Sequence, residues 1–269
     1  MVWILRVFSI LAHLIQLSRS RAIHFWARFR YANPTAIWMF RWWLRSFASR
    51  VLKKRFHAPN NLGTVPVMYI NLDKRLDRSQ AIEGEFDRIG LRSPRRFSAI
   101  ENENPMLGAA RSHLAVLEEF ALSSPESLVM VCEDDLTFIG SREELDQVVK
   151  EFAGDPRLDV LCLAYMNKNT TKAVEIKEVR ATEHLLISNQ ILTQACYVLK
   201  PSAIAPVIGS LRQSVRLLSA GVQWSYAAGD VYWQTLQQGR LFFAYPEKRL
   251  ARQSAGHSDI WNHYKDLAV

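Results

Sequence analysis

The sequence predicts an α/β fold in which a mostly parallel sheet carries helices on both faces. Strand-like apolar segments alternate with helical segments from residue 65 to residue 165. The strand-like segments are continuously apolar, as in sheets that are covered on both faces. Hydrophobic residues make up 49% of the 269 residues, which is enough for a full core.

The expected elements follow from these patterns. Ligands bind at the carboxyl ends of the strands in such sheets, so residues that follow a strand are candidates for a site. Beyond residue 170 the alternation weakens into several short strands up to residue 200. Strands are expected at 65–72, 96–100, 128–132 and 158–165, and helices at 79–89, 109–122 and 143–152.

The charges of the chain are unevenly distributed. Residues 1–72 hold 11 Arg or Lys and no Asp or Glu, whereas the remainder holds 34 − 11 = 23 basic and 26 acidic residues, a net charge of −3. A basic leader therefore precedes a slightly acidic body. Such an asymmetry indicates an anionic partner for the leader, either a membrane or a nucleic acid.

The leader, residues 1–58, is rich in tryptophan as well as arginine and ends before a linker at residues 59–63. Residues 1–17 are at the short limit for a spanning helix and are interrupted by Arg6, His13 and Gln16, so the sequence leaves open whether this segment spans the membrane or lies on it. Five later residues recur at helical spacing and predict one apolar face, flanked by Arg41, Arg45 and Arg50. An aromatic face beside arginines is typical of a helix that lies in the plane of an anionic membrane surface. The apolar-face residues are Ile37, Phe40, Leu44, Phe47 and Val51.

Two other interpretations of the leader stay open. Its aromatic residues could cap the core of the body as ordinary packing helices, or the segment could be a transit peptide or a nucleic-acid-binding arm. The domain division is the same in each case: residues 1–58 form the leader and residues 59–269 form the body.

The three cysteines, Cys132, Cys162 and Cys196, each lie in an apolar segment. No CxxC or Cys–His spacing is present, so the sequence gives no support for a zinc site. Three buried, reduced thiols are the simplest expectation, and they fit a cytosolic compartment.

An acidic triplet, Glu133-Asp134-Asp135, follows the apolar run VMVC. A strand that stops on three acids delivers carboxylates to the carboxyl edge of the sheet, where Mg²⁺ or Mn²⁺ finds the oxygen ligands it prefers. Carboxylates this close repel one another unless a cation lies between them. Alone, the triplet is as compatible with a helix cap or a solvated turn as with a metal site.

The surroundings of the triplet resemble glycosyltransferase family 25, which includes bacterial lipopolysaccharide and collagen galactosyltransferases. The resemblance covers residues 65–261 and leaves the leader out. One departure is Gly108-Ala109-Ala110-Arg111, where many members have a Gly-Cys pair. The matching segments, in order, are YINLDKRLDR, FSAI, RSHLAVLEEF, VMVCEDD, TQACYVLKPSAI, GDVYW and ARQSAGHSDI.

The resemblance implies a GT-A-like fold and inverting transfer of a sugar from a UDP-sugar, most often UDP-galactose, with a divalent metal (Mn²⁺ or Mg²⁺). It implies an oligosaccharide or lipid-linked saccharide acceptor, such as lipopolysaccharide core. With the basic leader, it predicts a peripheral enzyme on the cytoplasmic side of the membrane, the inner membrane in a bacterium.

The same resemblance gives the candidate residues their roles. The end of the first strand would line the nucleotide pocket, and Arg75 or Arg78 would meet the diphosphate with its guanidinium fork. Ser112 and His113 would belong to the donor site. Asp134 would contact the donor and, with Asp135, hold the metal, while Glu133 orients or caps. The residues at the first strand's end are Asn71, Leu72 and Asp73.

Two further residues lie late in the chain. An inverting transfer needs a general base near the acceptor hydroxyl, and Asp230, between Gly229 and a group of aromatic residues, is the candidate. His257, in a polar segment after LFFAYP, is a candidate to complete the metal shell.

Two functions of other classes compete with catalysis. The chain could be a non-catalytic, membrane-bound saccharide-binding or scaffold protein of the same fold, which the intact acids argue against. The leader could also bind nucleic acid, which we regard as the weaker interpretation beside a membrane surface.

Overall fold

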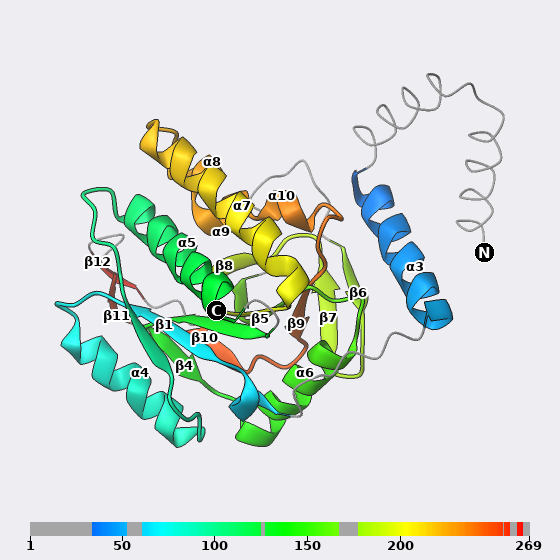
Figure 1. The fold of residues 1–269 in the computed structure, drawn as a ribbon, viewed down its shortest axis with the longest axis horizontal. Helices are drawn as coiled ribbons and strands as arrows, with labels where there is room; N and C mark the ends of the chain where they lie inside the picture. The colour runs from blue at the N-terminus through cyan, green and yellow to red at the C-terminus, as the bar shows by residue number, and fades with distance from the viewer. Residues whose placement is uncertain are drawn as a thin grey trace.

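The computed structural model describes residues 34–52, 61–124, 127–166, 177–254, 256–258 and 263–265 (Figure 1). Its central feature is an eight-stranded sheet in the order β2-β1-β3-β8-β5-β9-β7-β6. The strands of this sheet are β1 Val67–Asn71, β2 Arg95–Ser98, β3 Val129–Glu133, β5 Val160–Met166, β6 Glu178–Arg180, β7 Leu185–Ser188, β8 Leu192–Leu199 and β9 Phe243–Pro246.

The sheet is mixed but mostly parallel, as predicted. The pairings make β1, β2, β3, β5, β6 and β9 run in one direction and β7 and β8 in the other. Two small ribbons accompany the sheet, one of β4 Leu136–Phe138 with β10 Ala251–Gln253 and one of β11 Gly256–Ser258 with β12 His263–Lys265.

Helices cover both faces of the sheet, which confirms the predicted fold class. The helices are α3 Pro34–Leu52, α4 Leu76–Arg88, α5 Pro105–Ser123, α6 Arg142–Gly154, α7 Pro201–Ser219, α8 Trp224–Ala227, α9 Gly229–Tyr232 and α10 Gln234–Gln237, with the 3-10 turn η1 Leu62–Thr64. Because successive strand residues point to opposite faces, β1 sends Tyr69 to one core and Ile70 to the other. The first core contains residues of α3, α4 and α6, and the second contains residues of α5, α7 and α10 together with Trp233.

The predicted elements of the body are present, with ends that differ by a few residues. Helix α5 begins at Pro105 rather than at residue 109, because the Asn104 side chain accepts hydrogen bonds from the backbone N–H groups of Met106 and Leu107. Helix α6 begins with a capping box between Ser141 and Glu144. Such local caps fix where the chain enters each helix.

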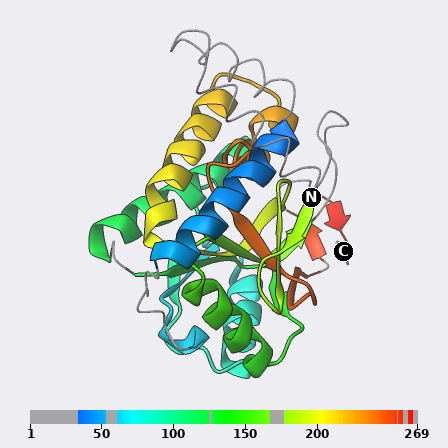
Figure 2. The same cartoon turned by 90° about the vertical axis from the view of Figure 1, so that its right-hand side faces the viewer.

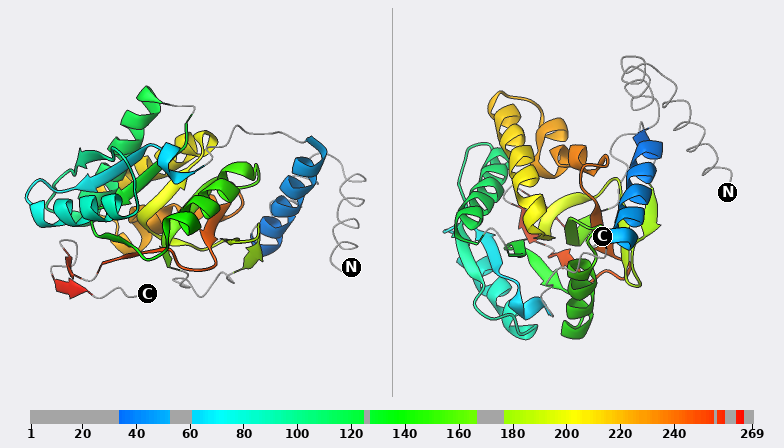
Figure 3. Two further views of the ribbon diagram at one scale, coloured as in Figure 1. Left: turned by 90° about the horizontal axis from the view of Figure 1, so that it is seen from below. Right: turned by 45° about the vertical axis from the view of Figure 1, so that its right-hand side comes forward.

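Helix α3 packs against the body through its tryptophans. Trp38 is fully buried and Trp42 is 7% exposed, and both lie beside Phe242, with ring centroids 5.8 and 5.1 Å apart. Figures 2 and 3 show α3 at the β7–β9 end of the molecule, away from α4. The inner face of α3 therefore packs against the core of the body, which is one of the interpretations of the leader that the sequence left open.

The arginines of α3 also face the protein. Arg41 donates to the carbonyl of Gly239 at 2.9 Å, and Arg45 contacts Asp159 at 2.5 Å. The expected apolar face is divided: Ile37 is buried, but Leu44 and Phe47 are 43% and 58% exposed. Arg41 and Arg45 therefore have acceptors within the protein, beside Trp38 and Trp42, and the membrane contact of the leader stays a prediction.

No helix within the described part of the chain has the length and apolarity needed to cross a bilayer. Residues 1–33 and 53–60, which hold the rest of the predicted leader, lie outside the described residues. The three cysteines are buried and free, as expected.

Candidate functional site

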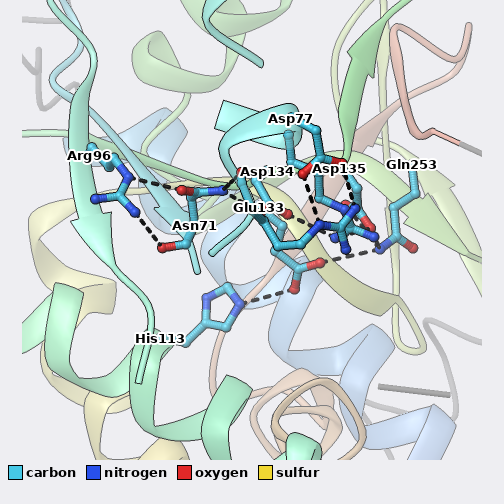
Figure 4. Close-up of polar contacts among 10 residues, drawn as sticks. Asn71, Asp77, Arg96, His113, Glu133, Asp134, Asp135 and Gln253 are labelled. Carbon is cyan, nitrogen blue, oxygen red and sulfur yellow. Dashed lines mark hydrogen bonds and ion pairs between the residues drawn. The ribbon is translucent and has the colours of Figure 1, made fainter. Parts of the chain in front are cut away.

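The site forms where neighbouring parallel strands end. Strands β2, β1 and β3 are adjacent and parallel, so Ser98, Asn71 and Glu133 lie at one edge of the sheet. Figure 4 shows the acidic triplet there, with Asn71 between Arg96 and Asp134. The acids and the end of the first strand therefore lie together at this edge.

Asn71 connects the elements of this edge. It is 1% exposed, and its Nδ2 donates to Oδ2 of Asp134 at 2.8 Å and to the carbonyl of Arg75 at 3.0 Å. Its Oδ1 accepts from Nε of Arg96 at 2.9 Å. Both ends of the amide are used, so Asn71 holds Asp134 in place from β1.

Asp134 is the acid of the triplet that lies closest to Arg78. Besides Asn71 on Oδ2, it receives Nη1 of Arg78 on Oδ1 at 3.0 Å, and only 10% of its side chain is exposed. Burial raises the pKa of Asp134, and Arg78 and Asn71 oppose that rise. Both oxygens already have protein donors.

Glu133 is also contacted on both oxygens, by His113 and Gln253, whereas Asp135 has only longer contacts. The two acids share the amide of Gln253, whose Nε2 lies 3.2 Å from Glu133 Oε2 and 3.4 and 3.5 Å from the two oxygens of Asp135. Arg78 lies 4.0 Å from Asp135. Burial and the neighbouring Glu133 raise the pKa of Asp135 to about 7. The carboxylates of Glu133 and Asp135 thus lie on either side of the Gln253 amide.

This donor set suits a hard divalent cation. With all three acids ionised, Arg78 leaves the triplet with a net charge of −2, and the side chains of Glu133 and Asp135 are 26% and 22% exposed. Mg²⁺ and similar ions use one or two carboxylates and complete their shell with water and substrate phosphates. Glu133 and Asp135 could therefore hold such an ion, with Asp134 as their neighbour.

A second acidic group offers a comparison. Within the described residues, only Glu151, Glu183 and His184 bring one ligand atom each to within 4.8 Å of one another. Glu151 is already bonded to Thr182, Gln147 and His184, and the group lies away from the strand ends of the triplet. These contacts explain the group as a local ion pair between Glu151 and His184.

The loop after β1 is organised by ion pairs. Arg75 makes a two-point contact with Asp77, at 3.0 and 2.9 Å, and its backbone N–H donates to the carbonyl of Leu72 at 2.9 Å. Asp73 is bonded by Arg96 and Ser98, which lower its pKa. Leu72 and Arg75 thus shape the turn beside the site, and Arg78 pairs with Asp134 of the triplet.

Ser112 and His113 lie on α5 but face different neighbours. Ser112 donates to the carbonyl of Gly108 at 2.8 Å and accepts from the backbone of Ile100 at 2.8 Å. A Cβ at Gly108 would lie 2.7 Å from the Ile100 carbonyl, so this close approach requires glycine. His113 contacts the triplet directly, with Nε2 3.1 Å from Glu133 Oε1. The donor-site role of Ser112 remains a prediction.

Asp230 begins α9 close to the first residues of β8. Its Oδ2 accepts from the backbone N–H of Thr193 at 3.2 Å, and burial, with a smaller contribution from Glu133, raises its pKa. Thr193 has a φ of 74°, which is strained for a β-branched residue, and the β5–β8 register is irregular beside it. Irregular backbone of this kind concentrates at functional sites.

Arg96 and Tyr197 were not assigned to the site from the sequence, whereas Gln253 belongs to the polar C-terminal segment of His257, which was expected to close over the donor. Gln253, Arg96 and Tyr197 reach the site from β10, β2 and β8, and Gln253 is 118 residues from Asp135. No local spacing indicates a pairing of that range. The predicted ligand His257 lies in β11, whose backbone pairs with β12, and its side chain lies outside what the structure describes.

No protein-family model matches the chain, and no curated protein matches it in sequence. Several solved structures are similar to it at low level, and two of them are described here. One is a glycosyltransferase involved in the glycosylation of the major capsid of PBCV-1, with 9% identity over 57% of this chain and 65% of that chain, and a TM-score of 0.35.

The other is mannose-1-phosphate geranyltransferase from Thermus thermophilus, with 8% identity over 74% of this chain and 59% of that chain, and a TM-score of 0.34. The chain thus matches less than two thirds of the length of either protein.

Proposed function

We propose that the chain is a glycosyltransferase of the GT-A-like, family 25 type, which transfers a sugar from a UDP-sugar to a glycan with inversion. The observation that carries the proposal is the edge formed by β1 and β3. There, three carboxylates, one arginine and a buried asparagine converge beside the strained backbone that holds Asp230. A nucleotide-sugar transferase needs such an edge for the diphosphate of its donor.

We assign the divalent cation, Mn²⁺ or Mg²⁺, to Glu133 and Asp135 rather than to Asp134. When bound, such an ion neutralises the negative charge of the leaving diphosphate. The pairing of Asp134 with Asn71 and Arg78 supports this assignment, because it leaves Asp134 as the residue that fixes the β3 turn.

Asp230 is the proposed general base. The acceptor hydroxyl oxygen would form the new bond to the anomeric carbon as the bond to UDP breaks, and Asp230 would take the hydroxyl proton. The buried setting that raises the pKa of Asp230 makes it a stronger base than an exposed carboxylate.

Galactose is the proposed donor sugar, and lipopolysaccharide core or another lipid-linked saccharide is the proposed acceptor. A screen of UDP-sugars with the purified full chain and Mn²⁺, followed by mass measurement of products on candidate oligosaccharides, tests both. Turnover with at least one UDP-sugar that stops in excess EDTA is expected. Full turnover in EDTA would contradict the metal, and UDP-sugar binding without turnover would favour a saccharide-binding protein.

We also propose that the leader binds an anionic membrane from the cytoplasmic side. In support, Trp43, Leu44 and Phe47 of α3 are 40%, 43% and 58% exposed, and the rings of Trp43 and Phe47 stack with centroids 6.0 Å apart. Exposed aromatic side chains favour the headgroup region of a bilayer. Residues 1–58 add 11 cations and no acid.

A further inference from the structure

A buried row of three polar side chains leads into the candidate cation site. Tyr197 of β8 is fully buried, His113 of α5 is 2% exposed, and Glu133 ends β3. Nδ1 of His113 lies 3.1 Å from the Tyr197 hydroxyl, and Nε2 lies 3.1 Å from Glu133 Oε1. The row joins three elements that are distant in sequence.

The chemistry of the end groups sets the direction of these hydrogen bonds. An ionised carboxylate only accepts, so Nε2 of His113 must carry the hydrogen that it donates to Glu133. In the neutral ring, Nδ1 is then the acceptor for the Tyr197 hydroxyl. The ring of Tyr197 packs edge-on against Trp233, with centroids 5.6 Å apart, and lies 5.8 Å from the His113 ring. The imidazole is therefore held at both nitrogens and across its face.

The two oxygens of Glu133 have separate partners. Oε1 is held by His113, and Oε2 lies 3.2 Å from the Gln253 amide, which also reaches Asp135 (Figure 4). A glutamate has three side-chain torsions, so without an inward partner Oε2 would not be kept beside Asp135. The contact on Oε1 determines where Oε2 points.

We propose that His113, held by Tyr197, is a positioning residue that fixes Glu133 for the divalent cation. The inference rests on the proposed function, because it assumes a cation between Glu133 and Asp135. Partners that orient metal ligands in this way contribute about 10–100-fold to metal affinity. His113 itself touches neither the cation nor the donor in this account.

Two substitutions at residue 113 separate positioning from packing. In His113→Gln the amide nitrogen can occupy the place of Nε2 and keep the donor to Glu133. In His113→Asn the shorter side chain can reach only the place of Nδ1, so the contact with Tyr197 survives and the donor to Glu133 is lost. Both remove the ring, so a purely structural role would affect them alike.

The measurement is Mn²⁺ affinity of the full chain, read from the electron paramagnetic resonance signal of free Mn²⁺. We expect His113→Asn to bind Mn²⁺ about 10–100-fold more weakly than wild type and His113→Gln to stay close to wild type. Ser214→Ala, which removes a buried hydroxyl bonded to the Ala227 carbonyl, is the matched control and should not change the affinity. Equal losses in both His113 variants would overturn the positioning role.

A second measurement uses wild-type protein without metal, so it does not depend on whether the variants fold. Nitrogen-15 spectra of the wild-type imidazoles, recorded without metal, should show one buried histidine with its hydrogen on Nε2. A hydrogen on Nδ1 alone would overturn the inference and leave the proposed function standing. Wild-type protein that binds no Mn²⁺ would instead overturn the cation assignment and this inference together.

Discussion

Asp159 and Asp135 lie at opposite edges of the same sheet, and their surroundings differ sharply. Asp159 precedes β5, is 5% exposed, and accepts from Arg45 at 2.5 Å and from the Phe242 backbone at 2.8 Å. Asp135 follows β3, which runs in the same direction, and shares one amide with Glu133. Burial raises the pKa of both; Arg45 opposes the rise at Asp159 and Arg78 opposes it at Asp135, where Glu133 adds to the rise.

We call the edge of the sheet at Asp159 the structural edge and the edge at Glu133 and Asp135 the chemical edge. A buried carboxylate that is fully paired holds elements together, as Asp159 holds α3 to β5 and β9. A carboxylate left with too few donors beside another acid weakens the fold and is retained for a ligand. The substitutions at Asp230, Asp159 and Asp135 below each act on one edge and should leave the other unchanged.

The largest expected effect is loss of the fold on deletion of residues 1–58. That deletion removes Trp38, Trp42 and Arg45, so Phe242 is exposed and Asp159 loses its arginine. Deleting residues 1–33 keeps all of α3 and should leave a cooperative unfolding transition. Circular dichroism and urea unfolding of the two truncations measure this, and a cooperative transition in the longer deletion would show that α3 is dispensable.

At the chemical edge, Asp230→Asn should lower turnover about 10²–10⁴-fold at saturating donor, because Asn keeps the shape and removes the base. Donor affinity and the free energy of unfolding should change little. Steady-state kinetics with UDP-sugar and titration with UDP separate the two quantities. If UDP affinity fell while turnover at saturation survived, Asp230 would be a donor ligand.

At the structural edge, Asp159→Ala should lower the free energy of unfolding by about 3 kcal/mol, because Arg45 and the Phe242 N–H lose their acceptor. Asp135→Ala is the matched substitution at the other edge and should leave stability unchanged or raise it, since it removes repulsion from Glu133. Urea unfolding of both variants checks the contrast. Equal destabilisation would remove the distinction between the edges.

The sequence predicts the local features of these edges but not the contacts between residues that are far apart in the chain. The strands and helices of the body follow from local periodicity, and the strand end at Glu133 follows from where the apolar run stops. The partners of the acids do not, because Asn71, Arg78 and Gln253 lie 56–120 residues away from them. Sequence therefore indicates the triplet but cannot show that Asn71 and Arg78 pair with Asp134 rather than with Glu133.

The face of α3 is a second case. Periodicity assigned the apolar face to Leu44 and Phe47, yet Trp38 and Trp42 lie inward because the aromatic Phe242 receives them. Arg41 and Arg45 accompany the tryptophans, since the Gly239 carbonyl and the Asp159 carboxylate accept their hydrogens. A hydropathy pattern cannot identify acceptors supplied by another part of the chain.

The smallest expected effect concerns the outward side of α3. Replacing Trp43 and Phe47 together with Ser should weaken binding to anionic liposomes about tenfold or more, because each exposed aromatic ring contributes on the order of 1 kcal/mol of apolar burial. Stability should change by less than about 0.5 kcal/mol per site. Co-sedimentation across a salt series measures the binding. Unchanged binding would place the membrane contact outside this side of α3.

The central claim is that Glu133 and Asp135 hold a cation, and equilibrium Mn²⁺ binding by the full chain tests it most directly. Wild type and Asp159→Asn should bind one Mn²⁺, and Asp135→Asn should not. Because the pKa of Asp135 is about 7 without metal, protons compete with the ion, and affinity should rise between about pH 6 and pH 8. Mn²⁺ binding that survives in Asp135→Asn, or that does not occur in wild type, would contradict the account.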